Sequence, residues 1–535
     1  MCIRDSQQLS SEALDARALA LKESVSSIQQ FVGSEKEIPK INYYIYASAE
    51  SKALQQNNST QAHFDFGSNS VHTIINDKYA DNYIEKENQL ILRHLLGEPT
   101  TPILETGLAI TFTDQWQREG YRYWAAQLSA SGNALSIAAL MDQELQQYES
   151  PLIRDCMAAT FVDFLIAKEG RPAFLNKYAN REFSTAVQEE LEAAWQDYHS
   201  TLSSMYPKRK REKQETLDLK GFNFAHEGYR IFNGYLSKLA TQSIEKQAGL
   251  GCNAIAIVPY SYMRDNQKPT PLPITNRPGS ENDQGVIHSA YEAKTRGMTT
   301  MLKPQIWLRG SWPGGIEMQS AEDWQSFYTY YHKWIIHYAL LAEIHEIDQL
   351  CVGVEFVKAT LAHEDQWRKI FTSVRGLYQG QMTYAANWGD EFEKVKFWDA
   401  LDFIGLNCYY PLSKNKEASK AELSNNFEKV KTKISKVHKN FQKPVVFTEI
   451  GFRSIAAPWI HPHAEGDDSY NETHQDRCYQ VIMEAVKDED WYGGILWWKF
   501  PSYLRYGGAK NTSYTPNNKL AEETISQWFS RDNIN

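Results

Sequence analysis

The sequence predicts an α/β protein, in which a (β/α)8 TIM barrel forms the C-terminal part and an α-rich accessory domain precedes it. Three observations carry this prediction. Eight short apolar or β-branched runs follow residue 217, with helical patterns between them, as in repeated βαβ units. The first run lacks the glycine-rich phosphate turn of an open doubly wound sheet, which favours a closed barrel. Before residue 206, apolar residues recur at three- and four-residue intervals, which indicates amphipathic helices.

The domain limits follow from length and from one charged segment. A chain of 535 residues is long enough for two to four domains. The basic run YPKRKREKQE, residues 206–215, separates the helical pattern from the strand-rich one. We therefore predict an accessory domain over residues 1–205, a basic linker over 206–216 and the barrel over 217–532.

The composition excludes several classes of protein. Hydrophobic residues make up 42% and charged residues 23%, which is typical of a folded globular chain. A net charge of -10 gives no general attraction to nucleic acid, so we expect no nucleic-acid partner. No apolar stretch is long enough to predict a membrane span. Aromatic residues reach 13%, and their flat faces can serve as platforms for sugar rings.

Individual elements can be placed in order. In the first part, residues 15–33 and 150–170 have helical patterns, and residues 41–48 (INYYIYAS) predict a strand. The eight barrel runs are residues 221–226, 252–260, 297–308, 349–356, 381–388, 403–411, 444–452 and 493–500. Residues 320–346 and 426–441 are the clearest helices between them. Strand and helix thus alternate through the predicted barrel.

The functional residues of a TIM barrel lie where its strands end, at the C-terminal face. In this chain the polar and aromatic residues at the ends of the runs are His226, Tyr260, Trp307, Glu355, Asn387, Trp388, Tyr409, Tyr410, Glu449, Trp497 and Trp498. Two of them, Glu355 and Glu449, are carboxylates that end the fourth and seventh runs. A glutamate in an apolar run is costly to bury without a partner, which favours function, although a structural ion pair is the alternative.

Two carboxylates across one cleft suit glycoside hydrolysis, in which one acid protonates the leaving oxygen and the other group meets the oxocarbenium-like centre. Aromatic neighbours would provide a surface for the sugar. An apolar surround of Val352, Val354 and Phe356 favours the neutral acid at Glu355. The Tyr409 hydroxyl is expected to stabilise the ionised form of Glu449.

The motifs KGFNFAHEGYR, VGVEF, KPVVFTEIGFRS and GGILWWKF resemble the β-mannanase family of glycoside hydrolases numbered 113, over about residues 220–529. That family belongs to a clan of retaining (β/α)8 enzymes. The resemblance implies that Glu355 is the general acid/base and Glu449 the nucleophile of a double displacement. Many members of the wider clan carry asparagine immediately before the acid/base, whereas this chain has Val354.

The substrate contacts are predicted from strand order. Asn387 is the candidate to contact the sugar 2-hydroxyl in place of the missing asparagine. Trp497 and Trp498 are adjacent, so a strand points them to opposite faces, and we favour Trp497 as the platform. His226, Trp307, Trp388 and Tyr409 complete the predicted binding residues. Packing inside the barrel is the alternative for His226, Tyr260, Trp307 and Trp388.

The segment 85–112 also resembles the helix pair of a gluzincin-type zinc peptidase, in which HExxH precedes a downstream glutamate. Here the motif reads Leu90-Ile91-Leu92-Arg93-His94, so the first histidine and the general base are absent. His94 and Glu105 occupy the two remaining ligand positions. Because a zinc site needs three protein ligands and a base, we expect a degenerate and inactive domain with structural roles for both residues.

The leading hypothesis is a glycoside hydrolase that cleaves β-1,4-mannosidic bonds in mannan, glucomannan or galactomannan. The alternatives are a β-1,4-glucan or mixed-linkage glucan hydrolase with the same mechanism, and a glycan-binding protein without activity. The expected partner is a polysaccharide or oligosaccharide, and the chemistry implies neither a cofactor nor a metal. Because polymeric mannan stays outside cells, we expect a secreted, periplasmic or surface enzyme whose export signal is missing here; the alternative is cytoplasmic.

Overall fold

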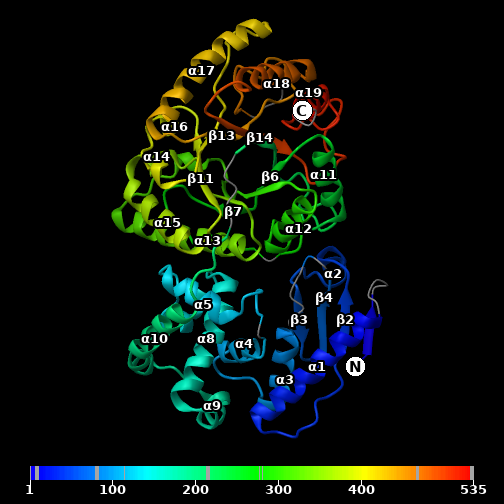
Figure 1. Cartoon of the computed structure of the whole chain (residues 1–535), viewed down its shortest axis with the longest axis vertical. Helices are drawn as coiled ribbons and strands as arrows, with labels where there is room; N and C mark the ends of the chain where they lie inside the picture. The colour runs from blue at the N-terminus through cyan, green and yellow to red at the C-terminus, as the bar shows by residue number, and fades with distance from the viewer. Residues whose placement is uncertain are drawn as a thin grey trace. The chain divides into compact units, whose positions relative to one another are not determined.

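The structure is a computed structural model of the chain, which describes residues 2–5, 11–76, 78, 84–113, 115–211, 217–275, 277–279, 281–464 and 469–530. It divides into two compact units (Figure 1). The accessory unit comprises Met1–Lys210 with Ser373–Leu377, and the barrel unit comprises Arg211–Thr372 with Tyr378–Asn535. The division at residue 210 lies within the predicted linker, of which residues 212–216 fall outside the described ranges.

The accessory unit is rich in helices, as predicted, and begins with a small mixed sheet. The sheet has the order β1-β2-β4-β3, in which only β3 runs antiparallel to its neighbour. Its strands are β1 (Cys2–Asp5), β2 (Asn42–Tyr46), β3 (Ala62–Asp65) and β4 (Ser70–Ile74). The helices are α1 (Ser11–Val32), α2 (Ala49–Gln56), α3 (Glu85–Leu96), α4 (Ile103–Thr111), α5 (Tyr121–Ala130), α6 (Ile137–Met141), α7 (Gln143–Gln146), α8 (Pro151–Glu169), α9 (Arg171–Lys177), η1 (Tyr178–Asn180) and α10 (Thr185–Met205).

Two contacts show how this unit is held together. Gly107 lets α4 approach α8 closely, because a Cβ there would lie 2.2 Å from the carbonyl oxygen of Ala158. On the other side, Glu87 of α3 is fully buried and accepts a hydrogen bond from Arg17 of α1 at 2.6 Å. The Tyr43 hydroxyl of β2 also donates to Glu87, so one buried carboxylate joins two helices and the sheet.

The barrel prediction is confirmed. Eight parallel strands close in the order β5-β6-β8-β10-β11-β12-β13-β14, with β14 pairing back onto β5. They are β5 (Leu219–Phe224), β6 (Ala254–Ile257), β8 (Thr299–Leu302), β10 (Gln349–Val354), β11 (Gln381–Asn387), β12 (Ile404–Asn407), β13 (Val445–Ile450) and β14 (Tyr492–Phe500). Each predicted run therefore contains one strand of the closed barrel, and two of the runs continue into a further strand outside it.

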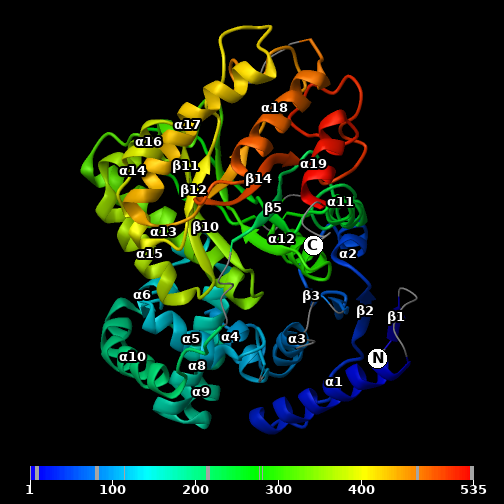
Figure 2. The ribbon, with the colours of Figure 1, turned by 45° about the horizontal axis from the view of Figure 1, so that its top comes forward.

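Helices surround the ring of strands (Figure 2). They are α11 (Lys238–Gly249), α12 (Asp283–Lys294), η2 (Pro313–Gly315), α13 (Ala321–Ile344), α14 (Val357–Ala362), α15 (Glu364–Leu377), α16 (Asp390–Lys394), η3 (Phe397–Ala400), α17 (Lys420–Phe441), α18 (Glu472–Val486) and α19 (Leu520–Ser530). Across the described ranges of both units, no helix combines the length and the apolar character that crossing a membrane requires.

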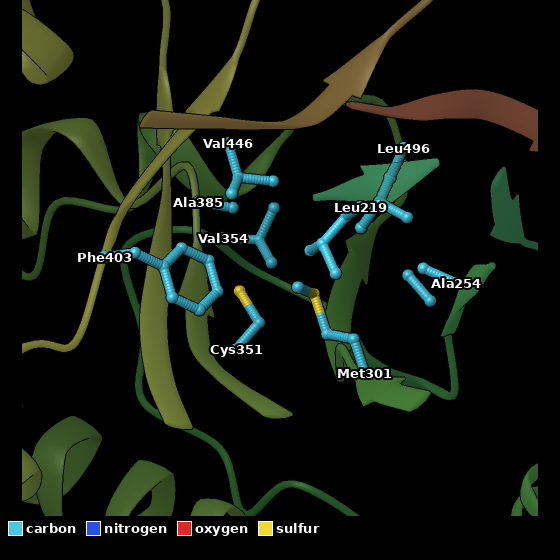
Figure 3. Packing of buried hydrophobic residues seen from close by; sticks show 10 residues of the cluster. Leu219, Ala254, Met301, Cys351, Val354, Ala385, Phe403, Val446 and Leu496 are labelled. Atoms are coloured by element: carbon cyan, nitrogen blue, oxygen red, sulfur yellow. The ribbon is translucent and has the colours of Figure 1, made fainter. Parts of the chain in front are cut away.

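The interior of the barrel is filled with side chains and is not a channel. Figure 3 shows apolar residues from successive strands that point toward one another, among them Leu219, Met301, Cys351, Val446 and Leu496. All of these are at most 2% exposed. This packed layer fills the middle of the barrel. A site that binds a ligand is therefore expected at the C-terminal ends of the strands.

The second and third runs differ from the prediction of one strand each. Proline interrupts both, at Pro259 and Pro304, where the missing N–H breaks the barrel ladder. Beyond these prolines the chain forms β7 (Tyr260–Met263) and β9 (Gln305–Leu308), which pair with each other in parallel outside the closed barrel. This two-stranded β7–β9 ribbon extends the barrel wall past its rim.

Candidate active site

A cavity of about 1140 Å³ opens at the C-terminal ends of the barrel strands. Its lining includes Glu355, which directly follows β10, and Glu449 of β13. The fourth and seventh runs therefore bring both predicted carboxylates to one cavity. This volume is slightly above the roughly 300–1,000 Å³ that small-molecule pockets occupy, so the cavity has room for more than one sugar ring.

Glu449 is surrounded by hydrogen-bond donors. Lys303 Nζ lies 2.6 Å from Glu449 Oε1, and the lysine side chain is fully buried. Gln305 Nε2 donates to the same oxygen at 2.7 Å. The predicted bond from the Tyr409 hydroxyl is present, at 3.1 Å from Oε2. One cation and two neutral donors therefore contact the two oxygens of Glu449.

Glu355 has the opposite environment. Burial, and next the negative charge of Glu449, raise the pKa of the Glu355 carboxyl from 4.5 to about 8. Asn407 Nδ2 donates to Oε1 at 3.0 Å, and Thr448 in turn donates to the Asn407 side-chain oxygen at 3.0 Å. At neutral pH Glu355 is therefore protonated and can give up a proton, as a general acid must.

The backbone at Glu355 is in the left-handed region, with φ of 58°. The next peptide N–H, that of Phe356, donates to the Tyr384 hydroxyl at 2.6 Å, and Tyr384 donates to Glu391 at 2.7 Å. Glu391 is 1% exposed and also accepts from the Asn387 N–H at 2.6 Å. This buried chain of bonds joins the ends of β10 and β11 and holds an uncommon backbone conformation in place.

The choice of Trp497 as the sugar platform is wrong. Trp497 is fully buried and stacks on Tyr479, with ring centroids 3.8 Å apart. Its neighbour Trp498 lines the cavity, and Lys303 Nζ lies 5.8 Å from the centre of the Trp498 ring. The two residues do point to opposite faces, but the sequence does not reveal which face meets the cavity.

The other predicted binding residues all line the cavity: His226, Trp307, Asn387, Trp388 and Tyr409. Trp307, on β9, is 48% exposed. The His226 ring packs edge-on against Tyr260, at 5.0 Å. Burial and the nearby Lys499 cation lower the pKa of His226 to about 4, so this ring is neutral at pH 7. The structure thus brings together every predicted site residue except Trp497.

Sequence reasoning missed several residues that contact the two glutamates or support the backbone beside Glu355. Lys303 carried a signal, because a lysine inside the apolar run GMTTMLKPQIWL has to find a buried partner. Asn407, a polar residue in FIGLNCYYP, carried a weaker one. Gln305 and Glu391 had none: Gln305 follows a proline, and Glu391 lies in a short polar helix after β11.

In the accessory unit, the two residues compared with zinc ligands have other partners. Glu105 accepts two hydrogen bonds from Arg93, at 2.7 and 2.6 Å. His94 Nε2 lies 2.6 Å from Asn69 Oδ1. Within the described ranges, no cluster of three or more metal-ligating side chains occurs. Arg93, from the degenerate motif itself, therefore neutralises Glu105. The segment compared with peptidases, residues 85–112, lies entirely within the described ranges.

The solved structures similar to this chain include the GH113 β-mannanase AaManA from Alicyclobacillus acidocaldarius in complex with ManMIm, and a GH113 β-1,4-mannanase. Both are 25% identical and cover 59% of this chain; the first is covered over 98% of its length with a TM-score of 0.53, the second over 100% with 0.52. No curated protein matches the chain.

The family comparison covers the barrel and both glutamates. The model of Glycoside Hydrolase Family 113 matches residues 224–519, more than half of the chain. Its limits enclose the strand ends that line the cavity, from His226 to Trp498. The protein is therefore a glycoside hydrolase, and the chain belongs to Glycoside Hydrolase Family 113.

Proposed function

We propose that this glycoside hydrolase cleaves β-1,4-mannosidic bonds by a retaining double displacement, with Glu355 as acid/base and Glu449 as nucleophile. The observation that carries the proposal is the contrast between the two carboxyls in one cavity. Burial keeps Glu355 protonated, whereas Glu449 is paired with Lys303. Such a divided environment assigns the roles of acid and nucleophile.

In the first step, Glu355 transfers its proton to the glycosidic oxygen while the C1–O bond breaks. A carboxylate oxygen of Glu449 bonds to C1 and forms a glycosyl ester, and the rest of the chain leaves as an alcohol. The negative charge of Glu449 is consumed here. Because that charge helps to raise the pKa of Glu355, its loss makes the resulting Glu355 carboxylate easier to maintain.

In the second step, the Glu355 carboxylate takes a proton from water as the water oxygen bonds to C1. The ester bond breaks, Glu449 returns to its carboxylate form, and Glu355 is protonated again. Lys303, Gln305 and Tyr409 then donate to the released carboxylate. Both inversions occur at C1, so the product keeps the configuration of the bond that was cleaved.

Mannan is the proposed substrate because two similar solved structures, each 25% identical to this chain, are β-mannanases. Mannose and glucose differ at C2, where a few hydrogen bonds separate them. Asn387 lines the cavity at the end of β11, and its backbone N–H donates a hydrogen bond to Glu391. We assign Asn387 to the 2-hydroxyl contact that the wider clan makes from the position of Val354.

The test measures product release from β-mannan, glucomannan, cellulose and mixed-linkage glucan by the parent, Glu449→Gln and Glu355→Gln. Mannan hydrolysis should fall by roughly three or more orders of magnitude in Glu449→Gln. As a matched control, Glu523→Gln on the exposed face of α19 should retain parental activity. NMR of the first products should show the new reducing end in the β configuration.

Each alternative has its own outcome. Activity confined to the glucans would keep the mechanism and overturn the substrate. A first product in the α configuration would overturn the double displacement. A folded parent that binds glycans without cleaving any of the four would point to a glycan-binding protein.

A further inference from the structure

The loop after β9 presents an aromatic ring that the mechanism above does not use. Trp312 precedes the short helix η2 and lines the same cavity as Glu355 and Glu449. It is 43% exposed, which is unusual for the largest apolar side chain. An exposed ring at a cavity wall is a candidate for contact with ligand.

One face of the Trp312 ring is fixed by the backbone. A Cβ at Gly314 would lie 2.3, 2.5 and 2.6 Å from three atoms of the six-membered ring, so the indole lies flat against the glycine. Any larger residue at position 314 would displace the ring. One face is therefore packed on Gly314 while a large part of the side chain is open.

The loop itself is pinned to its neighbour. Asn266, which follows β7, donates from Nδ2 to the carbonyl oxygen of Gly315 at 2.9 Å. The N–H of Glu317 donates back to the carbonyl oxygen of Asn266 at 2.9 Å. The N–H of Gly315 closes the turn onto the carbonyl oxygen of Trp312 at 3.0 Å. Ordering the loop before binding lowers the entropy cost of any stacking contact.

The position of Trp312 separates it from the catalytic pair. At the end of β8 the chain places Lys303 beside Glu449, and Trp498 lies over that lysine. After Lys303 the chain continues beyond the barrel rim through β9, in which Trp307 is half exposed. Trp312 follows four residues after the end of β9. Trp498 is thus the ring beside the nucleophile, and Trp312 lies further along the wall.

We propose that Trp312 is the stacking platform of a separate subsite, which holds a sugar ring of a β-1,4-linked oligosaccharide other than the ring attached to Glu449. This proposal rests on the proposed function and adds to it that the enzyme requires a chain of several sugars. The face of a pyranose is apolar and matches an indole face, while its hydroxyls remain in water. A cavity of about 1140 Å³ has room for such a chain.

The experiment compares kcat/KM for mannohexaose with that for the shortest manno-oligosaccharide the parent hydrolyses. Trp312→Ala should lose about ten-fold on mannohexaose, the scale of one lost stacking contact, and little on the short substrate. On mannohexaose, kcat/KM of Trp312→Phe should lie between that of the parent and that of Trp312→Ala. Equal losses on both substrates, or none on either, would overturn the proposal.

Substitutions at two neighbouring glycines form a matched pair of variants in which Trp312 itself is unchanged. Gly314→Ala should act like Trp312→Ala, because the new methyl group displaces the ring. A Cβ at Gly315 would approach Ser311 Oγ at 3.3 Å and Trp312 Nε1 only at 3.9 Å, so Gly315→Ala should keep parental kinetics. Circular dichroism and the melting temperature establish that both variants fold. Identical kinetics for the two variants would also count against the platform.

Failure of the proposed function can be distinguished from failure of the platform. If the parent hydrolyses no mannan, calorimetric binding of mannohexaose and cellohexaose replaces kinetics. Weaker binding by Trp312→Ala than by the parent would then retain the platform while the mannanase proposal falls. A parent that cleaves mannohexaose no better than Trp312→Ala keeps the mannanase proposal and removes the platform.

Discussion

Lys303 and Glu449 form an ion pair within the barrel mouth, 2.6 Å apart, and the lysine side chain is completely buried. Lys303 Nζ also donates to Asn223 Oδ1 at 3.0 Å and to the Thr448 carbonyl oxygen at 2.9 Å. All three of its donor positions are therefore used inside the protein. In the proposed mechanism, a cation fixed in this way balances the charge of Glu449 each time the carboxylate is released.

Replacing this cation should affect catalysis more than replacing its neutral neighbour. Lys303→Met leaves a buried carboxylate without its ion-pair partner, which costs about 3–5 kcal/mol in comparable cases. We expect kcat/KM on mannan to fall by about 10²-fold or more. Gln305→Met removes one neutral donor from the same oxygen and should cost less, about 1.5–3 kcal/mol. Equal losses in both variants would contradict a special role for the lysine.

The activity should decline on the alkaline side as Glu355 loses its proton. Since the pKa of Glu355 is raised to about 8, the alkaline limb of kcat/KM against pH should have its midpoint near pH 8. The charge of Glu449 is the second cause of this shift. Glu449→Gln should therefore lower the pKa of Glu355, which carbon-13 NMR of labelled glutamate measures directly. An unchanged pKa in that variant would show that burial alone sets it.

The same raised pKa predicts a stability effect with a definite sign. A carboxyl whose pKa is higher in the folded state than in the unfolded state contributes stability below about pH 4.5, which is lost as pH rises toward 8. Glu355→Gln does not titrate. It should therefore melt higher than the parent at pH 8, by roughly 2 °C or more, with the difference shrinking toward pH 4.5. Calorimetry at both values checks this, and a constant difference would contradict it.

The hydrogen bonds behind Glu355 should matter for turnover more than for binding. Tyr384→Phe leaves the Phe356 N–H buried without its acceptor and loosens the backbone that carries the acid. We expect kcat to fall about ten-fold with KM little changed. Tyr378→Phe is the matched control, because its buried hydroxyl donates to the Ile347 carbonyl oxygen at 2.8 Å, before β10 begins. This variant should lose stability and keep kcat.

The adjacent tryptophans of β14 should separate binding from stability. Trp498→Ala removes a ring of the cavity wall and should raise KM about ten-fold with little change in the melting temperature. Trp497→Ala removes a fully buried ring stacked on Tyr479 and should cost about 3–5 kcal/mol of stability. The reverse pattern would indicate that Trp497 is the sugar platform.

Several parts of this fold could be predicted because they depend on local patterns. The eight barrel runs are nearly continuous apolar stretches, since parallel strands are buried on both faces. The same runs end in Glu355 and Glu449, so the position of the cavity followed from the barrel topology. The prolines at 259 and 304 are the sequence signal that two of these runs are each divided.

Other parts could not be predicted, because they depend on distances between strands. Nothing in the order of residues shows that Lys303 reaches Glu449 across the barrel, 146 positions along the chain. The choice between Trp497 and Trp498 depends on the register of β14, where a shift of one residue exchanges the two faces. Glu391 lies in α16 and supports the backbone after β10 through Tyr384 of β11, which a sequence pattern does not encode.

The left-handed backbone at Glu355, with φ of 58°, has a consequence for how this protein can change over generations. Glycine and asparagine occupy that conformation most readily, so the position is one where the fold and the chemistry prefer different residues. If selection for catalysis were absent, substitution of Glu355 by glycine or asparagine would be favoured. Either residue removes the cost of the strained backbone and the cost of burying a carboxyl group. Relatives that have lost activity in this way should therefore have a larger free energy of unfolding than active relatives and should still bind glycans.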